Sequence, residues 1–253
     1  FFLFFLYLNF CFGEEPQQLS CSEAPKFKMF GDDDCKSVYF IRHAEGTHNE
    51  AETEAMRAGT FSPPEDILLE ENSGKLYWDA SLTDKGISQS QVLQKIVAME
   101  GGSQYPMLEL VVTSTLSRAL QTANIALGGE TGWGHKARWV ATELARERIA
   151  DYMCDGRKSI SSLKTKFPHV DFVDFTSDQD NWFSTRKEVD GGAKIKARAL
   201  SFMSWLFTNK EKHIAVVSHS IFLNNLFQLM GNANLTKLGN AEMRVATVCH
   251  NDM

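Results

Sequence analysis

Two residues that can carry charge follow an apolar run near the start of the chain. In the segment VYFIRHAEGTHN, residues 38–49, four apolar residues lead directly to Arg42 and His43. Two later runs end in a similar way, because LVVT leads into STLSRALQTA, which holds Arg118, and IAVV leads into SHS, which holds His219. Two histidines and two arginines therefore follow apolar runs that have the length of buried strands.

This set of side chains suits a phosphate monoester as substrate. Arginine offers paired donors to phosphate oxygens, and helices that begin near Ser114 and after His219 would add backbone N–H groups. A neutral imidazole can attack phosphorus and hold the phosphoryl group covalently. The second histidine and the arginines can then stabilise the charge on the phosphoryl oxygens in the transition state.

The surrounding elements predict a three-layer α/β/α sandwich with a mostly parallel central sheet. From Lys36 onward, short apolar runs alternate with longer helical patterns, which is typical of a parallel sheet with helices on its faces. The ligand crevice of such a sheet lies beyond the carboxyl ends of its strands, so we expect the histidines and arginines to converge there. The predicted strands cover residues 37–41, 108–113, 138–142, 213–218 and 244–248.

Helical patterns fill the intervals between strands. Thr83 is expected to cap a helix from Asp84 to about Met99, with a buried face formed by Leu93, Ile96 and Val97. A second helix is predicted over residues 192–208, where four apolar residues recur at helical spacing: Ile195, Ala199, Phe202 and Leu206. The stretch from about residue 58 to 80 is read as a long excursion, of the kind that serves substrate access or has no role.

The first twelve residues, FFLFFLYLNFCF, are almost wholly apolar. They are shorter than the roughly 20 residues of a membrane span and fit the apolar region of a signal peptide. Residues 1–34 are therefore interpreted as an apolar leader and linker, including a solvated GDDD at 31–34, and residues 35–253 as the catalytic domain. The expected location is the cytoplasm if residues 1–12 are an artefact, and the secretory pathway or a plastid if they are a targeting remnant.

Composition limits the partners. A net charge of −6 with scattered Lys and Arg gives no overall attraction to nucleic acid or an anionic membrane, so neither is expected as a partner of the catalytic domain. The five cysteines are odd in number and lack C-x-x-C pairs, so buried or idle thiols are predicted in preference to a zinc site or a disulfide scaffold. The expected partner is a small phosphorylated substrate, and the sequence does not indicate an oligomeric state.

Four segments, IRHAEGTHN, TSTLSRALQTA, ELARE and VVSHS, resemble in this order the motifs of the histidine phosphatase superfamily, the phosphoglycerate-mutase-like clan. The resemblance implies that His43 is the phosphorylated nucleophile and His219 the second histidine of the pocket. It also implies that Arg42, Arg118 and Asn49 bind the substrate. Arg-His-Ala in place of the usual Arg-His-Gly, with ELARERIADYMCDGRKSI, is similar to the plant-type phosphoglycerate mutase-like branch.

The resemblance leaves the proton donor open between two residues. ELARE holds Glu143 and Glu147, and the family's Arg-Glu pair aligns best with Arg146 and Glu147, which favours Glu147. Arg157 and Lys158 either reach the substrate or belong to a solvated loop. The remaining histidines have no motif support and are interpreted as surface or core residues: His48, His135, His169, His213 and His250.

Other catalytic motifs do not fit. HAEGTH is not H-E-x-x-H, VVSHS lacks the glycines of a G-x-S-x-G elbow, and GWGHKA at 132–137 precedes a strand where a dinucleotide site needs a helix. The sequence therefore predicts a metal-independent phosphatase that works through phosphohistidine and needs no cofactor. The alternatives are a mutase-type phosphotransferase and a catalytically weak phospho-ligand binding protein.

Overall fold

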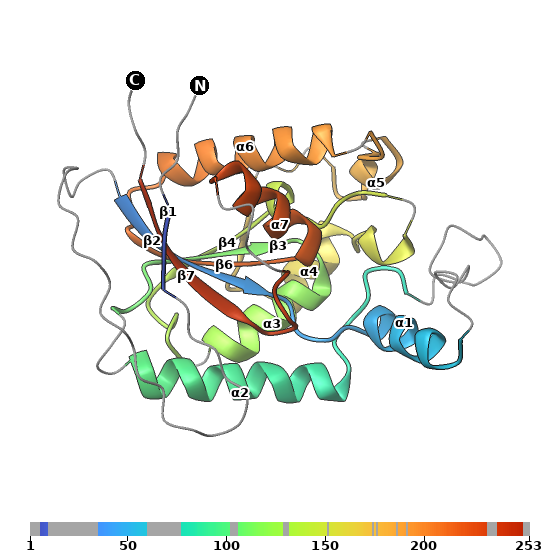
Figure 1. Ribbon diagram of the computed structural model, residues 1–253, viewed down its shortest axis with the longest axis horizontal. Helices are drawn as coiled ribbons and strands as arrows, with labels where there is room; N and C mark the ends of the chain where they lie inside the picture. Colours follow the sequence, from blue (N-terminus) through green and yellow to red (C-terminus); the bar gives the residue numbers. More distant parts are fainter. Residues whose placement is uncertain are drawn as a thin grey trace.

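The computed structural model describes residues 6–9, 35–59, 77–101, 106–128, 132–150, 152–173, 175, 177–185, 187–190, 192–231 and 237–249. Its centre is a seven-stranded sheet in the order β1-β7-β2-β6-β3-β4-β5 (Figure 1). The strands are β1 (Leu6–Asn9), β2 (Cys35–Arg42), β3 (Leu110–Ser114), β4 (Arg138–Thr142), β5 (Asp171–Phe172), β6 (His213–Ser218) and β7 (Met243–Cys249).

The sheet is mostly parallel, as predicted. β2 pairs in parallel with β6, β6 with β3, β3 with β4, and β4 with β5. Only the pairs that involve β7 are antiparallel among the described strands, since β7 runs opposite to both β2 and β1. The carboxyl ends of β2, β6, β3 and β4 therefore meet at one edge of the sheet.

Helices cover both faces of the sheet (Figure 1). One face packs against α6 and α7, and the other packs against α2, α3 and α4. The described helices are α1 (Thr47–Arg57), α2 (Asp84–Gly101), α3 (Ser117–Leu127), α4 (Ile160–Lys166), α5 (Asn181–Thr185), α6 (Ala193–Thr208) and α7 (Ser220–Leu229). This arrangement is the predicted three-layer α/β/α sandwich.

The alternation of side chains along β2 explains why its sequence is continuously apolar. Val38 and Phe40 join the core cluster under α6 and α7, whereas Tyr39 and Ile41 join the cluster on the opposite face. All four side chains are buried. A strand that is covered on both faces needs apolar residues at every position.

All five predicted strands are confirmed within two residues at their ends. β5 was not predicted, because two residues are too short to form a recognisable run. β1 was not predicted either, because Leu6–Asn9 lie in the segment interpreted as a leader; their backbone pairs with β7. The division of the chain at residue 34 stays a prediction.

The two predicted helices correspond to α2 and α6. Thr83 Oγ1 accepts a hydrogen bond from Gly86 N at 3.0 Å, so Thr83 caps α2 as expected. The prediction that Ile96 is buried is wrong, because its side chain is 43% exposed while Leu93 and Val97 face the core. Ile96 lies just outside the buried stripe of α2.

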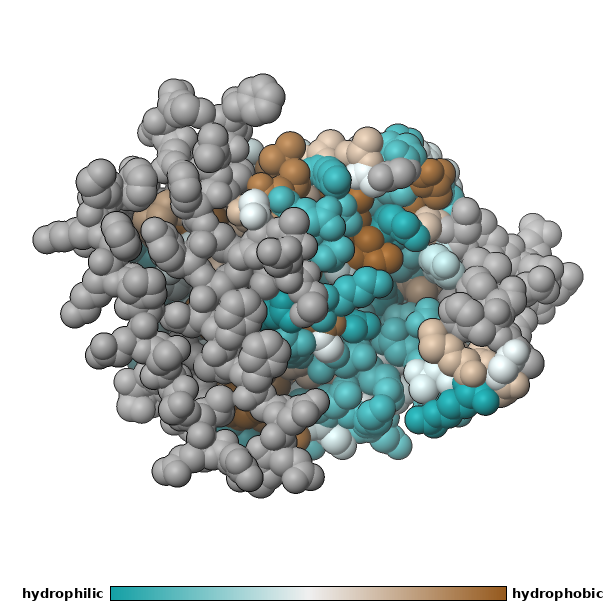
Figure 2. All heavy atoms as spheres, viewed as in Figure 1, coloured by the Kyte–Doolittle hydropathy of each residue, from teal (hydrophilic) through white to brown (hydrophobic). Residues whose placement is uncertain are grey.

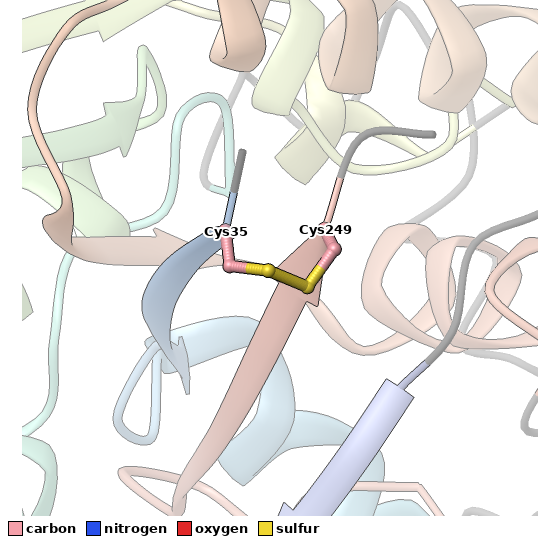
Figure 3. The surroundings of a disulfide bond; sticks show 2 residues. All are labelled: Cys35 and Cys249. Carbon is pink, nitrogen blue, oxygen red and sulfur yellow. A yellow bond between two sulfur atoms is a disulfide. The ribbon is translucent and has the colours of Figure 1, made fainter. Parts of the chain in front are cut away.

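The prediction of idle thiols is wrong for two of the cysteines. Cys35 at the start of β2 and Cys249 at the end of β7 form a disulfide (Figure 3). The antiparallel register places these two residues directly opposite each other. Because they are 214 residues apart in the sequence, no local pattern indicates that they pair. Cys154 is a free and buried thiol, as predicted.

Several predictions fall on residues that the structure does not describe. These are the GDDD linker, most of the excursion at 58–80, and His250. On the face shown in Figure 2, hydrophobic residues of the described part form separate patches among hydrophilic ones. Within the described residues, no helix combines the length and apolarity needed to span a membrane.

Candidate active site

The predicted residues converge at the carboxyl edge of the sheet. Arg42 ends β2 directly opposite Ser218, which ends β6. His43, the residue after β2, donates from its backbone N to Ser218 O at 2.9 Å. His219 follows Ser218, so the two histidines leave neighbouring parallel strands at the same level. Their ring centroids are 4.9 Å apart.

The side chain of His43 is oriented by a backbone carbonyl. Its Nδ1 lies 2.7 Å from Ala44 O, and because a carbonyl can only accept, Nδ1 carries the proton and donates it. Nε2 is then the nitrogen with the free electron pair. Burial lowers the pKa of His43 well below its usual value, and the charges of Arg118 and Arg42 lower it further. His43 is therefore a neutral imidazole whose Nε2 carries the free electron pair.

His219 lies at the N-cap position of α7 and is fully buried. Its Nε2 makes a hydrogen bond of 2.8 Å with Ser114 Oγ at the end of β3. Its Nδ1 is buried and has no hydrogen-bond partner in the part of the chain that the structure describes. Burial, followed by the charge of Arg118, lowers the pKa of His219 well below its usual value.

Arg118 lies in the first turn of α3 and is 1% exposed. Its guanidinium donates to Cys154 O at 2.5 Å and to Asp155 Oδ1 at 3.3 Å. Burial raises the pKa of Asp155 to about 7, although the charge of Arg118 opposes this rise. Arg118 is thus held from the side of Cys154 and Asp155 while its charge acts on both pocket histidines.

Arg42 is half-buried and donates from Nη1 to Leu238 O at 2.8 Å. Its Nε and the Nε of Arg118 are both buried without a hydrogen-bond partner among the described residues. Asn49 lies in α1, where its Oδ1 accepts from Gly46 N at 3.1 Å and closes a capping box. The Asn49 side chain therefore stabilises the helix start that follows His43.

The two candidate proton donors lie in different surroundings. Glu143 is buried and binds two cations, Arg146 at 3.0 Å and Arg157 at 2.6 Å. Glu147 is half-buried and accepts from Ile221 N at 3.1 Å and Phe222 N at 3.0 Å. These two amides belong to the first turn of α7, immediately after His219. Of the two glutamates, Glu147 is the one that contacts the helix following His219.

Arg157 is buried, so its interpretation as part of a solvated loop is wrong. Its Nε donates to Glu143, and its two terminal nitrogens donate to four backbone carbonyl groups. These carbonyls belong to Lys158, Ser177, Asp178 and Gln179. A guanidinium has five N–H groups, and all five are therefore used within the protein. Arg157 holds the loop at 177–179 in place.

Of Lys158 and the histidines without motif support, only His48 lies beside His43 in the part of the chain that the structure describes. Lys158 Nζ donates to Asp79 O at 3.4 Å. His135 and His169 are exposed, and His213 begins β6. His48 differs from them, because it is buried with its ring centroid 5.8 Å from that of His43. Its place next to Asn49 in the first motif was the signal that could have indicated this position.

Within the described residues, no group of three or more His, Cys, Asp or Glu side chains is arranged to hold a metal ion. The site offers nitrogen donors from Arg42, Arg118 and His219 instead, beside the free electron pair of His43 Nε2. Such a set is suited to an oxyanion, because arginine and imidazole N–H groups match the acceptor oxygens of phosphate.

Comparison with known proteins agrees with this chemistry. A sequence model of the histidine phosphatase superfamily (branch 1) matches residues 38–253. The chain belongs to the histidine phosphatase superfamily.

The sequence of this histidine phosphatase superfamily member is similar to those of plant proteins. It is 32% identical to a phosphoglycerate mutase-like protein of Arabidopsis thaliana over 222 residues, which cover 78% of this chain and 75% of the relative. Phosphoglycerate mutase-like protein 1 of the same plant is also 32% identical, with 78% and 73% coverage. A solved mycobacterial glucosyl-3-phosphoglycerate phosphatase is similar with 15% identity, a TM-score of 0.44, and coverage of 84% of this chain and 90% of that chain. The predicted resemblance to the superfamily and its plant-type branch is confirmed.

Proposed function

We propose that the protein hydrolyses a phosphate monoester through a phosphohistidine intermediate on Nε2 of His43. The observation that carries this proposal is the 2.7 Å hydrogen bond between Nδ1 of the buried His43 and Ala44 O. It fixes the tautomer in which Nε2 is free to attack, at the strand end where Arg42 and Arg118 supply positive charge. The substrate class is a phosphate monoester with a small leaving group, within the family's known phosphatase and mutase chemistry.

In the first step, the electron pair on His43 Nε2 forms a bond to phosphorus while the ester P–O bond breaks. The departing oxygen takes a proton from the Glu147 carboxylic acid, so that an alcohol leaves and Glu147 becomes a carboxylate. Arg42, Arg118 and His219 stabilise the charge on the three remaining phosphoryl oxygens. The imidazole keeps its Nδ1 proton and its bond to Ala44 O.

In the second step, the Glu147 carboxylate takes a proton from water, and the resulting hydroxide attacks phosphorus. The P–N bond breaks, inorganic phosphate leaves, and His43 returns to its neutral form. Glu147 is then protonated again, and the cycle is complete. The role of Glu147 is supported by its contacts with the first turn of α7, which follows His219 directly.

A mutase is the second candidate, because the curated relatives named above carry the words phosphoglycerate mutase-like. A mutase must retain a substrate with two phosphoryl groups, which requires additional free cations near the pocket. Arg146 and Arg157, two of the cations in the motif-linked segments, are bound to carboxylates and backbone carbonyls. Because these contacts already occupy both guanidinium groups, they favour hydrolysis over phosphoryl transfer to a second substrate.

The test begins with the intermediate. Brief incubation with a ³²P-labelled monoester should give a protein adduct that survives alkali and is lost in acid, as a phosphoramidate is. His43→Ala should form no adduct, and His169→Ala, which changes an exposed histidine, should form as much as wild type. An adduct on His43→Ala, or none on the wild type, would refute the proposal.

A second measurement separates the two reactions. The protein is supplied with 3-phosphoglycerate and 2,3-bisphosphoglycerate, and both 2-phosphoglycerate and inorganic phosphate are followed. We expect release of phosphate to be the faster process, and a panel of other monoesters then ranks the substrates. Formation of 2-phosphoglycerate that outpaces phosphate release would identify a mutase. Binding of phosphate without turnover of any monoester would identify a phospho-ligand binding protein.

A further inference from the structure

A third imidazole lies at the phosphoryl pocket, and the proposed mechanism does not use it. His48 is the second residue of α1, and its side chain is 5% exposed. Its ring lies 5.8 Å from the ring of His43, centroid to centroid, at an interplanar angle of 41°. Besides burial, the charges that lower its pKa are those of Arg118 and Arg42. His48 therefore shares its surroundings with the two arginines of the phosphoryl pocket.

The polar atoms around this site have unused hydrogen-bonding capacity. Nδ1 of His48 is buried and makes no hydrogen bond with the residues that the structure describes. Buried polar atoms nearly always have a partner, so a group of unpartnered ones calls for an explanation. Three further nitrogens of the pocket are in the same state: Arg42 Nε, Arg118 Nε and His219 Nδ1. A ligand with several acceptor oxygens accounts for the three nitrogens from β2, α3 and the start of α7, while the missing acceptor at His48 Nδ1 among the described residues places the His48 proton on Nε2.

Gly46 fixes which edge of the His48 ring is available. A Cβ atom on Gly46 would lie 2.8 Å from both Nδ1 and Cε1 of His48. Only a residue without a side chain leaves room for the ring in this orientation, since a Cβ contact under 3.0 Å forces a shift. The Nδ1 edge therefore packs against Gly46, and Nε2 is the ring nitrogen that remains for a ligand.

We infer that His48 is a third imidazole ligand of the phosphoryl group and donates Nε2–H to one of its oxygens. The inference rests on the proposed function, because it takes the anion of that site as its ligand. A neutral imidazole has one N–H group, and its proton resides where an acceptor is available. An anionic oxygen at Nε2 supplies that acceptor. In this role His48, the residue before Asn49, is a further hydrogen-bond donor to the phosphoryl group beside the two arginines and His219.

Binding of inorganic phosphate and of orthovanadate tests this role without requiring turnover. His48→Phe keeps a planar ring and removes both nitrogens, and loss of a hydrogen bond to a charged group should weaken binding of both anions roughly 10- to 100-fold. His48→Gln places an amide N–H near the position of Nε2 and should recover most of that loss, whereas His48→Asn, which mimics Nδ1, should not. His169→Phe is the matched control on an exposed histidine and should bind both anions as the wild type does.

Gly46→Ala provides an independent perturbation that leaves His48 in the chain. The backbone at residue 46 has φ −98° and ψ 162°, which alanine adopts without strain. The new methyl group should displace the ring and weaken phosphate binding several-fold. Melting temperatures of all variants are measured alongside, so that a loss of binding is compared only between folded proteins.

The outcomes separate this inference from the proposed function. Wild-type protein that binds phosphate and vanadate but neither hydrolyses a monoester nor forms an adduct refutes the hydrolase proposal, and the ratio of wild type to His48→Phe still decides the role of His48. Equal binding by wild type and His48→Phe overturns the inference while hydrolysis stands. Wild-type protein that binds neither anion overturns the inference as well.

Discussion

The disulfide between Cys35 and Cys249 should stabilise the domain without taking part in its chemistry. It joins the first residue of β2 to the last residue of β7, across a separation of 214 residues. Cross-linking removes entropy from the unfolded chain, and the loop-closure relation gives roughly 5 kcal/mol at 25 °C for a loop of this size, against about 2–4 kcal/mol for typical disulfides. For a domain of this length, a loss of about 2–5 kcal/mol lowers the melting temperature by roughly 4–20 °C.

Loss of the disulfide should leave the activity of the site unchanged. His43 lies at the opposite end of β2 from Cys35, and at about 3.3 Å per residue the two are roughly 25 Å apart. The double variant Cys35→Ala with Cys249→Ala should therefore unfold at lower urea concentration and lower temperature, yet retain kcat and KM when assayed well below its melting temperature. Activity that falls in parallel with stability at low temperature would contradict this separation.

The assay uses reduction as an internal control. Dithiothreitol should lower the urea midpoint of the wild type to that of the double variant and leave the double variant unchanged. After reduction in denaturant, the wild type should show two more reactive thiols than the double variant. Coincident urea midpoints for oxidised and reduced wild type would refute the reasoning.

Three further predictions concern the pocket. Glu147→Gln should slow hydrolysis of an alkyl phosphate by about a hundredfold to ten-thousandfold and that of an activated aryl phosphate much less; if Glu143→Gln gave that pattern and Glu147→Gln did not, the assignment would be reversed. Between about pH 4 and 7 Asp155 is ionised in the unfolded state but not in the folded state, because folding raises the pKa of Asp155 to about 7. The free energy of unfolding of the wild type should therefore fall relative to that of Asp155→Asn as the pH rises through this window. Urea titrations at several pH values measure this difference. EDTA should leave phosphate release unchanged, and loss of activity that zinc or magnesium restores would show that a metal is required.

Five of the seven strands and the convergence of four pocket residues could be predicted from the sequence. Buried parallel strands are continuously apolar, so their ends can be located, and parallel strands necessarily align their carboxyl ends. That is why the sequence alone predicts that Arg42, His43 and His219 lie close together. Arg118 followed from the same rule, because it lies in the first turn after β3.

What could not be predicted depends on contacts between distant segments. The pairing of Cys35 with Cys249 requires the antiparallel register of β2 and β7, which no local pattern encodes. The burial of Arg157 depends on carbonyl groups about 20 residues further along the chain. The position of His48 depends on the space left by Gly46 and on the direction in which α1 leaves the sheet. Each of these is a property of packing.

The two glutamates of ELARE illustrate how the structure separates residues that the sequence could not. Glu143 lies between the guanidinium groups of Arg146 and Arg157, and protonating it would leave two buried cations short of their partner, a change that costs several kcal/mol. A proton donor must pass through that state in every cycle, so this position is unsuited to the task. Glu147 accepts instead from the neutral amides of Ile221 and Phe222, which remain when its charge is lost. The proposed mechanism needs a carboxyl group that can lose its charge without leaving an ion pair broken, and the hydrogen-bond partners of Glu147 permit this whereas the two ion pairs of Glu143 do not.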